Sequence, residues 1–183
     1  MKSVNKLRKL KHHLEGKIYC KIFRRAGHGT FHNEGYIVDF NEDFVVVRES
    51  DDFELKGYLI FSTCSVKTIR FNENDAYYHQ IMQAEGITDQ LDYPHHIDLT
   101  SWTSLFQSIK DLGFHVIIEN ERPGIETFNI GPITAVKNKS VKIRYFNAAG
   151  YLDEKPTKFK WKDITLVKID DRYINVFSKY LRS

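Results

Sequence analysis

The sequence predicts a mainly β protein that also contains helices, built as two tandem small barrels of five antiparallel strands. Each barrel is expected to be preceded by a helix and followed by a shorter one. Short apolar runs alternate with turn-forming residues along both halves of the 183-residue chain. Each half also opens on a segment whose apolar residues have helical spacing. Finally, one order of elements occurs twice, 96 to 98 residues apart.

The first half begins with a predicted helix. Apolar residues recur every three or four positions from Val4 to Leu14, and Gly16 then favours a helix end. A further helix is predicted from Asp75, a good N-cap residue, to Gly86. Between these helices, apolar runs predict five strands, at residues 17–23, 35–40, 44–50, 57–62 and 66–71. The residues between the first two strands are expected to form a loop.

A linker is predicted between the two halves. Residues 87–99 lack a clear period and contain Pro94, so we expect no regular element there. The predicted domains are therefore residues 1–86 and residues 100–183, each with one barrel and its helices. A barrel of this size has a marginal core, so we expect the two barrels to pack as an intramolecular pseudo-dimer.

The second half repeats the pattern of the first. Its leading helix is predicted to begin at Thr100 or Ser101 and to end at Gly113, and its last helix to begin at Asp170 or Asp171. Its strands are predicted at residues 114–120, 131–136, 140–146, 158–161 and 164–169. The leading helix has a wider apolar stripe than one small barrel needs, so we expect it to face the other half. That stripe contains Trp102, Phe106 and Ile109.

The two halves align in register. With a shift of 96 residues Gly35 aligns with Gly131, and with a shift of 98 residues Val66 aligns with Ile164. We interpret the alignment as an internal duplication, with chance agreement of two alternating patterns as the alternative. The interpretation predicts that Gly35 and Gly131 occupy equivalent positions in a bent strand.

Two segments of the first half resemble the motifs of a known family. Residues 35–47, GYIVDFNEDFVVV, are similar to the first motif of Sm-like proteins, and residues 62–70, STCSVKTIR, to the second. The family includes the bacterial RNA chaperone Hfq, and other SH3-like small barrels share its plan. The resemblance implies a strand that bends at Gly35 and a hairpin loop that holds RNA bases. The positions it implies for base binding are Asn41 and Phe44 in the first half, and Lys137, Lys139 and Lys162 in the second.

Charge is unevenly distributed along the chain. Residues 1–28 contain nine Lys or Arg and one Glu, residues 29–135 contain six basic and 18 acidic residues, and residues 136–183 contain twelve basic and five acidic residues. If the two basic ends meet, they form a basic face for a polyanion; solvated charge on two small domains is the alternative. The side chains expected to contact phosphates are Arg8, Lys9, Lys11, Arg24, Arg25, Lys158, Lys160 and Lys162.

The segment KFKWK, residues 158–162, alternates Lys with aromatic residues. In a strand, Phe159 and Trp161 would face one side and the three Lys the other. This pattern favours buried rings beneath a basic outer stripe over a stacking platform for bases.

No pattern typical of a catalytic or metal site occurs. His28 and His32 lie four residues apart, but in an expected loop and without further ligands at zinc spacing. Cys20 and Cys64 lie within or beside apolar strands, as small buried residues do. We therefore expect no enzymatic activity, no metal and no cofactor.

The leading hypothesis is a non-enzymatic, cytoplasmic binding module with RNA as the first candidate partner. Two cysteines do not make a disulfide scaffold, and no apolar run approaches the length of a membrane span, so no membrane partner is expected. The alternative is a protein-interaction or regulatory module, such as an adaptor or an immunity-like protein, whose acidic surface contacts another protein. An enzyme of unrecognised type with a site between the barrels is a third hypothesis.

Overall fold

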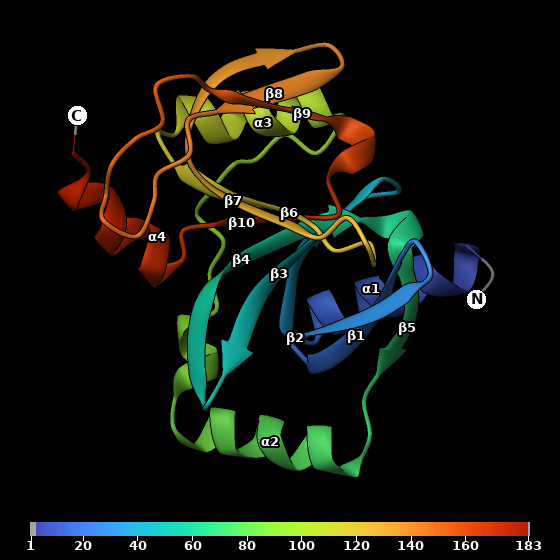
Figure 1. Ribbon diagram of the computed structural model, residues 1–183. Helices are drawn as coiled ribbons and strands as arrows, with labels where there is room; N and C mark the ends of the chain where they lie inside the picture. Colours follow the sequence, from blue (N-terminus) through green and yellow to red (C-terminus); the bar gives the residue numbers. More distant parts are fainter. Residues whose placement is uncertain (1–2, 183) are drawn as a thin grey trace. The chain divides into compact units, whose positions relative to one another are not determined.

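The computed structural model describes residues 3–182, which form a mainly β structure with four α-helices. The chain divides into two compact units, one ending at His95 and one beginning at His96. The elements of the first unit are α1 (Ser3–Glu15), β1 (Tyr19–Ala26), β2 (Gly29–Phe40), β3 (Phe44–Asp51), β4 (Glu54–Ser62), η1 (Thr63–Ser65), β5 (Val66–Arg70), α2 (Glu73–Ala84) and η2 (Ile87–Gln90), where η marks a 3-10 helix (Figure 1).

The second unit repeats this order of elements. Its helices and strands are α3 (Trp102–Asp111), β6 (His115–Asn120), β7 (Thr127–Lys137), β8 (Ser140–Ile143), β9 (Thr157–Lys160), η3 (Trp161–Asp163), β10 (Leu166–Ile169), α4 (Arg172–Phe177) and η4 (Ser178–Tyr180). The predicted succession of helix, five strands and helix is therefore confirmed in both halves. None of the helices in residues 3–182 is both long and apolar enough to cross a membrane.

Strand pairing is also the same in the two units. All ladders are antiparallel, with the order β5-β1-β2-β3-β4 in the first unit and β10-β6-β7-β8-β9 in the second. Helix α1 packs on β2, and α3 packs on the equivalent strand β7. Likewise α2 contacts β1, and α4 contacts β6. Order, pairing and helix packing all agree with an internal duplication.

The predicted closed barrels are wrong, because the sheet is open. A closed five-stranded barrel would join β5 to β4 and β10 to β9, the strands at the two ends of each order. Among residues 3–182 no ladder joins either pair. An alternating pattern reports which side chains face the core, and a bent open sheet covered by helices buries the same positions as a barrel. The sequence pattern therefore does not distinguish the two architectures.

Gly35 and Gly131 occupy the equivalent bent positions that the duplication predicts. Their φ angles are 147° and 153°, a region that residues with a Cβ rarely adopt. A Cβ at Gly35 would lie 2.1 Å from the carbonyl oxygen of Arg48, and one at Gly131 would lie 2.0 Å from that of Arg144. Two to four residues after each glycine, the pairing register shifts, in β2 against β3 and in β7 against β8. Close approach of two backbones thus requires glycine at both positions.

The first hairpin differs from the prediction. Residues 24–34, expected to form a loop, belong largely to β1 and β2, which pair from Tyr19 with Tyr36 to Ala26 with Gly29. The turn residue Gly27 has a positive φ of 60°, which suits the tight connection. The polar side chains of this ribbon obscured the strand pattern in the sequence.

The N-cap of helix α2 lies three residues earlier than predicted. Asn72 is its N-cap and accepts a hydrogen bond from the backbone N–H of Asp75. The Asp75 carboxylate in turn accepts from the backbone N–H of Asn72 at 3.0 Å, and it accepts two hydrogen bonds from the guanidinium of Arg70, at 2.8 Å and 2.9 Å. This is a capping box, so Asp75 lies inside the first turn rather than at the cap itself.

The segment predicted as a linker is partly packed. It contains the short helix η2, and it buries Leu91, Ile97 and Leu99. The hydroxyl of Tyr58 donates a hydrogen bond to the carbonyl oxygen of Asp92, which ties the segment to β4 of the first unit. The boundary between the two compact units falls within this segment.

The aromatic stripe of α3 has partners within its own unit. Phe106 is fully buried, and its ring stacks on that of Trp161 with 5.5 Å between ring centroids. Trp102 stacks on the same indole at 6.2 Å. These stacks account for the wide apolar stripe of α3 within the second unit.

Candidate functional site

Four lysines share one face of the three strands β7, β8 and β9. Lys142 on β8 lies directly opposite Lys158 on β9, and on its other side it pairs with Ala135 on β7. One row further along, Ser140 on β8 pairs with Lys137 on one side and with Lys160 on the other. Because residues two apart in a strand point to the same side, these side chains share one surface. We call Lys137, Lys142, Lys158 and Lys160 the lysine face.

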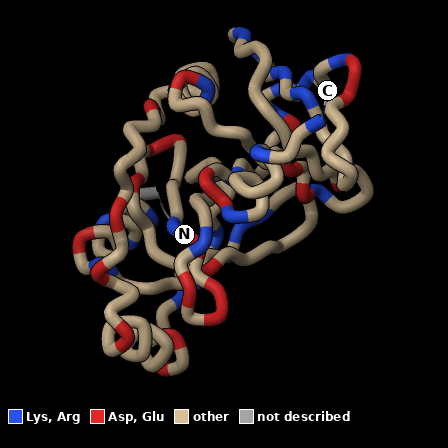
Figure 2. The backbone as a smooth tube through the Cα atoms, turned by 90° about the vertical axis from the view of Figure 1, so that its left-hand side faces the viewer, with Lys and Arg blue, Asp and Glu red and all other residues tan. Residues whose placement is uncertain are grey.

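The lysine face is electrostatically uncompensated. Directly opposed residues of antiparallel strands have Cβ atoms about 5 Å apart, and like charges at that distance destabilise the pair. Within residues 3–182, none of the four ammonium groups forms an ion pair with a carboxylate. Three of the four are exposed and Lys142 is half-buried. Figure 2 shows Lys and Arg prevailing over Asp and Glu in the part of the chain near the C-terminus. Such a surface attracts an anion with several charges.

The turn beside the lysine face is fixed by Trp161. Its indole N–H donates to the carbonyl oxygen of Asn138 at 2.9 Å, and its backbone N–H donates to that of Lys139. The guanidinium of Arg122 donates to the carbonyl oxygen of Lys162. The side chains of Lys139 and Lys162 are exposed near this end of the face. Trp161 itself lies in η3 and not in the strand, contrary to the prediction, and its ring is occupied by stacking on α3.

Arg24 is misplaced by the sequence-based prediction. It was expected at the surface beside Arg25, but it is fully buried. Its guanidinium lies 4.6 Å from the ring centroid of Phe61, and its Nε donates to Asn33 at 2.6 Å. Arg25, the next residue on the strand, points to the opposite side and is exposed. Arg24 therefore supports the core of the first unit and does not reach an external ligand in this structure.

The two residues of the first half that the resemblance implies for base binding have structural roles instead. The Asn41 side-chain oxygen accepts hydrogen bonds from the backbone N–H groups of Asp43 and Phe44, at 2.8 Å and 2.7 Å. Phe44 is 3% exposed and offers no free ring face to a base. The expectation that Phe44 would be available to RNA is therefore wrong, because its strand faces the core.

Replacing Asn41 with Ala tests this structural role. The change leaves two backbone N–H groups without their acceptor, so we expect the free energy of unfolding to fall by about 1–2 kcal/mol. Urea denaturation measures the loss, and RNA affinity measured on the folded variant should equal that of the wild type. A loss of RNA affinity with unchanged stability would instead identify Asn41 as a ligand contact.

The basic residues of α1 are exposed but partly engaged. The Arg8 guanidinium donates to the side chain of Asn5, and Lys11 lies 3.6 Å from Glu15, one turn later. Lys9 is exposed. These residues belong to the first unit, whereas the lysine face belongs to the second. Exposed pairs of this kind contribute little energy, so the α1 side chains are free to reorient.

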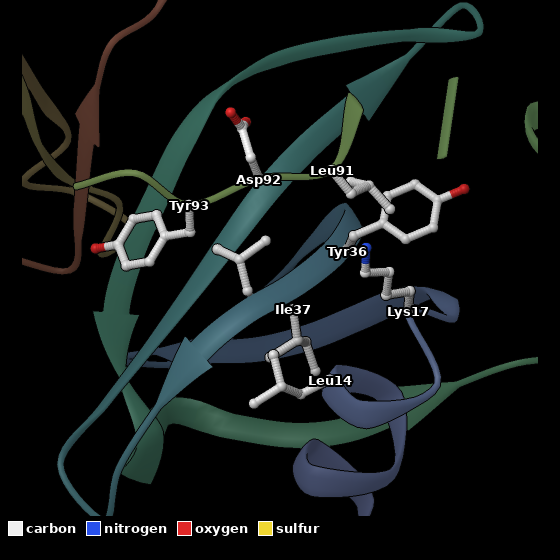
Figure 3. Close-up of a pocket in the computed structure, with 8 residues that line it drawn as sticks. Leu14, Lys17, Tyr36, Ile37, Leu91, Asp92 and Tyr93 are labelled. Atoms are coloured by element: carbon white, nitrogen blue, oxygen red, sulfur yellow. The ribbon is translucent and has the colours of Figure 1, made fainter. Parts of the chain in front are cut away.

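Two cavities in the first unit have walls unsuited to a polyanion. One, of about 110 Å³, lies between the end of α1, β2 and the segment after η2, with Leu14, Ile37 and Leu91 in its wall (Figure 3). It has room for a few water molecules at about 30 Å³ each, and not for a nucleotide. The other, of about 400 Å³, is lined by four carboxylates and two cations: Glu34, Asp51, Asp52, Asp75, Lys21 and Arg70.

Glu34 stays ionised in the larger cavity. Burial opposes its charge, but hydrogen bonds from the Tyr19 hydroxyl at 2.5 Å and from the Lys21 ammonium at 2.9 Å outweigh that effect. The pKa of Glu34 is therefore below its ordinary value. Lys21 pairs with Glu34 and Arg70 with Asp75, so Asp51 and Asp52 leave an excess of carboxylates in the wall, which disfavours phosphate.

Residues 3–182 contain no group of three or more His, Cys, Asp or Glu side chains arranged to hold a metal ion. Cys20 is buried, as expected, and burial raises the pKa of its thiol, whereas Cys64 is exposed, contrary to expectation. Comparison with protein-family models, with curated proteins and with solved structures gave no match.

Lys142 is the one residue of the lysine face that the prediction missed. The signal is present in SVKIRYF, residues 140–146, where polar and apolar residues alternate and place Ser140, Lys142 and Arg144 on one side. Lys142 belongs to the cluster only because β9 lies beside β8. The pairing of Lys142 with Lys158, 16 positions later in the chain, cannot be predicted from the sequence pattern.

Proposed function

We propose that the protein is a non-enzymatic binding module whose second unit binds single-stranded nucleic acid, with RNA as the first candidate, through the lysine face. The observation that carries the proposal is the direct opposition of Lys142 and Lys158, with Lys137 and Lys160 beside them and without carboxylate partners in the described residues. Phosphates along one strand would neutralise this cluster and release their counterions.

The Sm-like relationship remains part of this proposal. It is supported by the leading helix of each unit and by the bent strands at Gly35 and Gly131. Binding through the lysine face differs from the base-binding set that the resemblance implies, because Phe44 is buried and Asn41 holds its own turn. We therefore expect phosphate contacts to provide most of the affinity and little of the sequence preference.

The test is an affinity measurement on the double variant Lys142→Ala/Lys158→Ala. Each lost phosphate contact lowers affinity roughly tenfold near 50 mM salt, so we expect a loss of about 100-fold for a fluorescent random-sequence RNA of 20 nucleotides. The matched control is Lys67→Ala, an exposed lysine on β5 of the first unit, which should change affinity less than about twofold. Thermal melts establish that both variants are folded. Equal affinities of the double variant and the wild type would refute the proposal.

A protein partner is the second candidate. It is favoured by exposed Asp51 and Asp52 at the tip of the hairpin between β3 and β4, which would suit a basic protein surface. In that case the wild type would not retard RNA at low salt, and a polypeptide would co-purify with it. Replacing Asp51 and Asp52 with Asn should then release the polypeptide.

A further inference from the structure

The C-terminal part of the second unit presents an exposed aromatic stripe. Tyr173 on α4 is 52% exposed, Val176 is 47% exposed, and Tyr180 in η4 is 71% exposed. They follow one another at intervals of three and four residues, so they lie along one side of the helical segment. Buried positions lie on the other side, where Ile174 packs in the core of the unit. Two tyrosine rings exposed to this degree on one short segment are unusual for a surface that faces only water.

The stripe is held in place by its neighbours. The ring centroids of Tyr173 and Phe177 lie 5.2 Å apart, and Phe177 in turn stacks on Phe146, also with 5.2 Å between centroids. Beyond Tyr180, the backbone N–H of Arg182 donates to the carbonyl oxygen of Gly150 at 2.7 Å. The rings therefore sit on an anchored segment, and little order would have to be gained on binding.

Cationic side chains outnumber carboxylates around the stripe. Arg172, Lys179 and Arg182 are exposed, and residues 172–183 contain no Asp or Glu. The two preceding carboxylates serve the helix start: Asp171 accepts from the backbone N–H of Tyr173, and Asp170 accepts from the side chain of Asn175. Exposed aromatic rings among Lys and Arg are the surface that unpaired bases and their phosphates recognise together.

We propose that Tyr173 and Tyr180 form a stacking site for unpaired bases of a single-stranded nucleic acid, with Arg172, Lys179 and Arg182 beside the phosphates. The inference rests on the proposed nucleic-acid binding and adds a second contact surface within the same unit. A membrane surface fits less well, because α4 has only six residues and Val176 is the single exposed aliphatic residue of the stripe. Stacking on tyrosine tolerates any base but needs an uncovered base face, which a duplex does not offer, so the site selects single strands over duplexes.

The experiment compares two ligands and two double variants in the full chain. The ligands are a fluorescent RNA of 20 nucleotides and an abasic oligomer of the same length and charge. Tyr173→Ala/Tyr180→Ala should lower affinity for the RNA at least tenfold and affinity for the abasic oligomer less than twofold. Tyr173→Phe/Tyr180→Phe retains the rings and should keep wild-type affinity for both. The salt dependence of RNA binding should not change in either variant, because no phosphate contact is removed.

The outcomes separate this inference from the proposed function. Wild-type binding that depends on the lysine face but is equal for RNA and the abasic oligomer would overturn the stacking site alone. No wild-type binding to either ligand would overturn both proposals. Tyrosine-dependent binding to vesicles of phosphatidylglycerol, with unchanged RNA affinity in the Ala variant, would assign the stripe to a membrane surface instead.

Discussion

Replacing Gly131 with Ala is expected to lower the free energy of unfolding by about 4 kcal/mol or more. The new Cβ would lie 2.0 Å from the carbonyl oxygen of Arg144, a backbone atom that cannot move aside without breaking the pairing of β7. The φ angle of 153° adds backbone strain for any residue with a side chain. Gly35→Ala should have an effect of similar size, because its Cβ would lie 2.1 Å from the carbonyl oxygen of Arg48. Urea denaturation measures both losses.

Gly124→Ala is the matched control for this prediction. Gly124 also has a positive φ, 85°, but a Cβ there would have no atom within 4 Å. The free energy of unfolding of this variant should fall by only about 1 kcal/mol, from the strain of a positive φ in a residue with a side chain. If Gly131→Ala were no more destabilising than Gly124→Ala, the close approach of the two backbones would be refuted. A large effect at Gly131 with none at Gly35 would contradict the equivalence of the two halves.

Arg24 and Arg25 are expected to differ sharply although they are neighbours. Arg24→Ala removes a fully buried side chain from the ring of Phe61 and leaves Asn33 without its 2.6 Å partner. We expect a loss of about 3 kcal/mol or more in the free energy of unfolding, from the cavity and the unpaired amide together. Arg25→Ala changes an exposed side chain and should stay within about 0.5 kcal/mol of the wild type.

The same pair of variants separates two roles for these arginines. Had both been surface contacts for phosphate, as the charge pattern suggested, the two variants would weaken RNA binding equally and leave the midpoint of urea unfolding unchanged. Equal and small stability losses would therefore contradict the buried position of Arg24. The structure instead predicts a lower midpoint for Arg24→Ala alone, measured by circular dichroism.

Much of the fold is predictable from the sequence because each half has its own alternating pattern and its own helix signals. The repeat that aligns Gly35 with Gly131 identifies the bent strands, since only glycine suits both positions. Sheet closure is not predictable in this way, because it depends on how far each sheet bends and not on which face is buried. The hairpin of β1 and β2 was missed because its distal residues are mostly polar and resemble a loop.

For the candidate site, the sequence identifies the basic residues but does not predict which of them lie side by side. The alternation in CKIFRRA, residues 20–26, already places Arg24 on the same side as Ile22 and the exposed Arg25 on the other. The alternation was not extended to Arg24 and Arg25 because both were expected to lie in a loop and not in a strand. The lysine face required the pairing of β8 with β9, which joins segments separated by the irregular residues 144–156. Pairing at that separation is decided by packing of the whole unit, so it emerges only in three dimensions.

The salt dependence of RNA binding tests the central claim most directly. For single strands, the logarithm of the affinity falls with the logarithm of salt concentration with a slope of about −0.7 per neutralised phosphate. The four lysines of the lysine face contribute about −3 to the wild-type slope when all are engaged, so Lys142→Ala/Lys158→Ala should reduce the magnitude of the slope by about 1.5. Fluorescence anisotropy titrations between about 25 and 200 mM KCl measure both slopes, a range over which the Debye length falls roughly threefold. A slope near zero, or the same slope in both proteins, would contradict phosphate binding by this face.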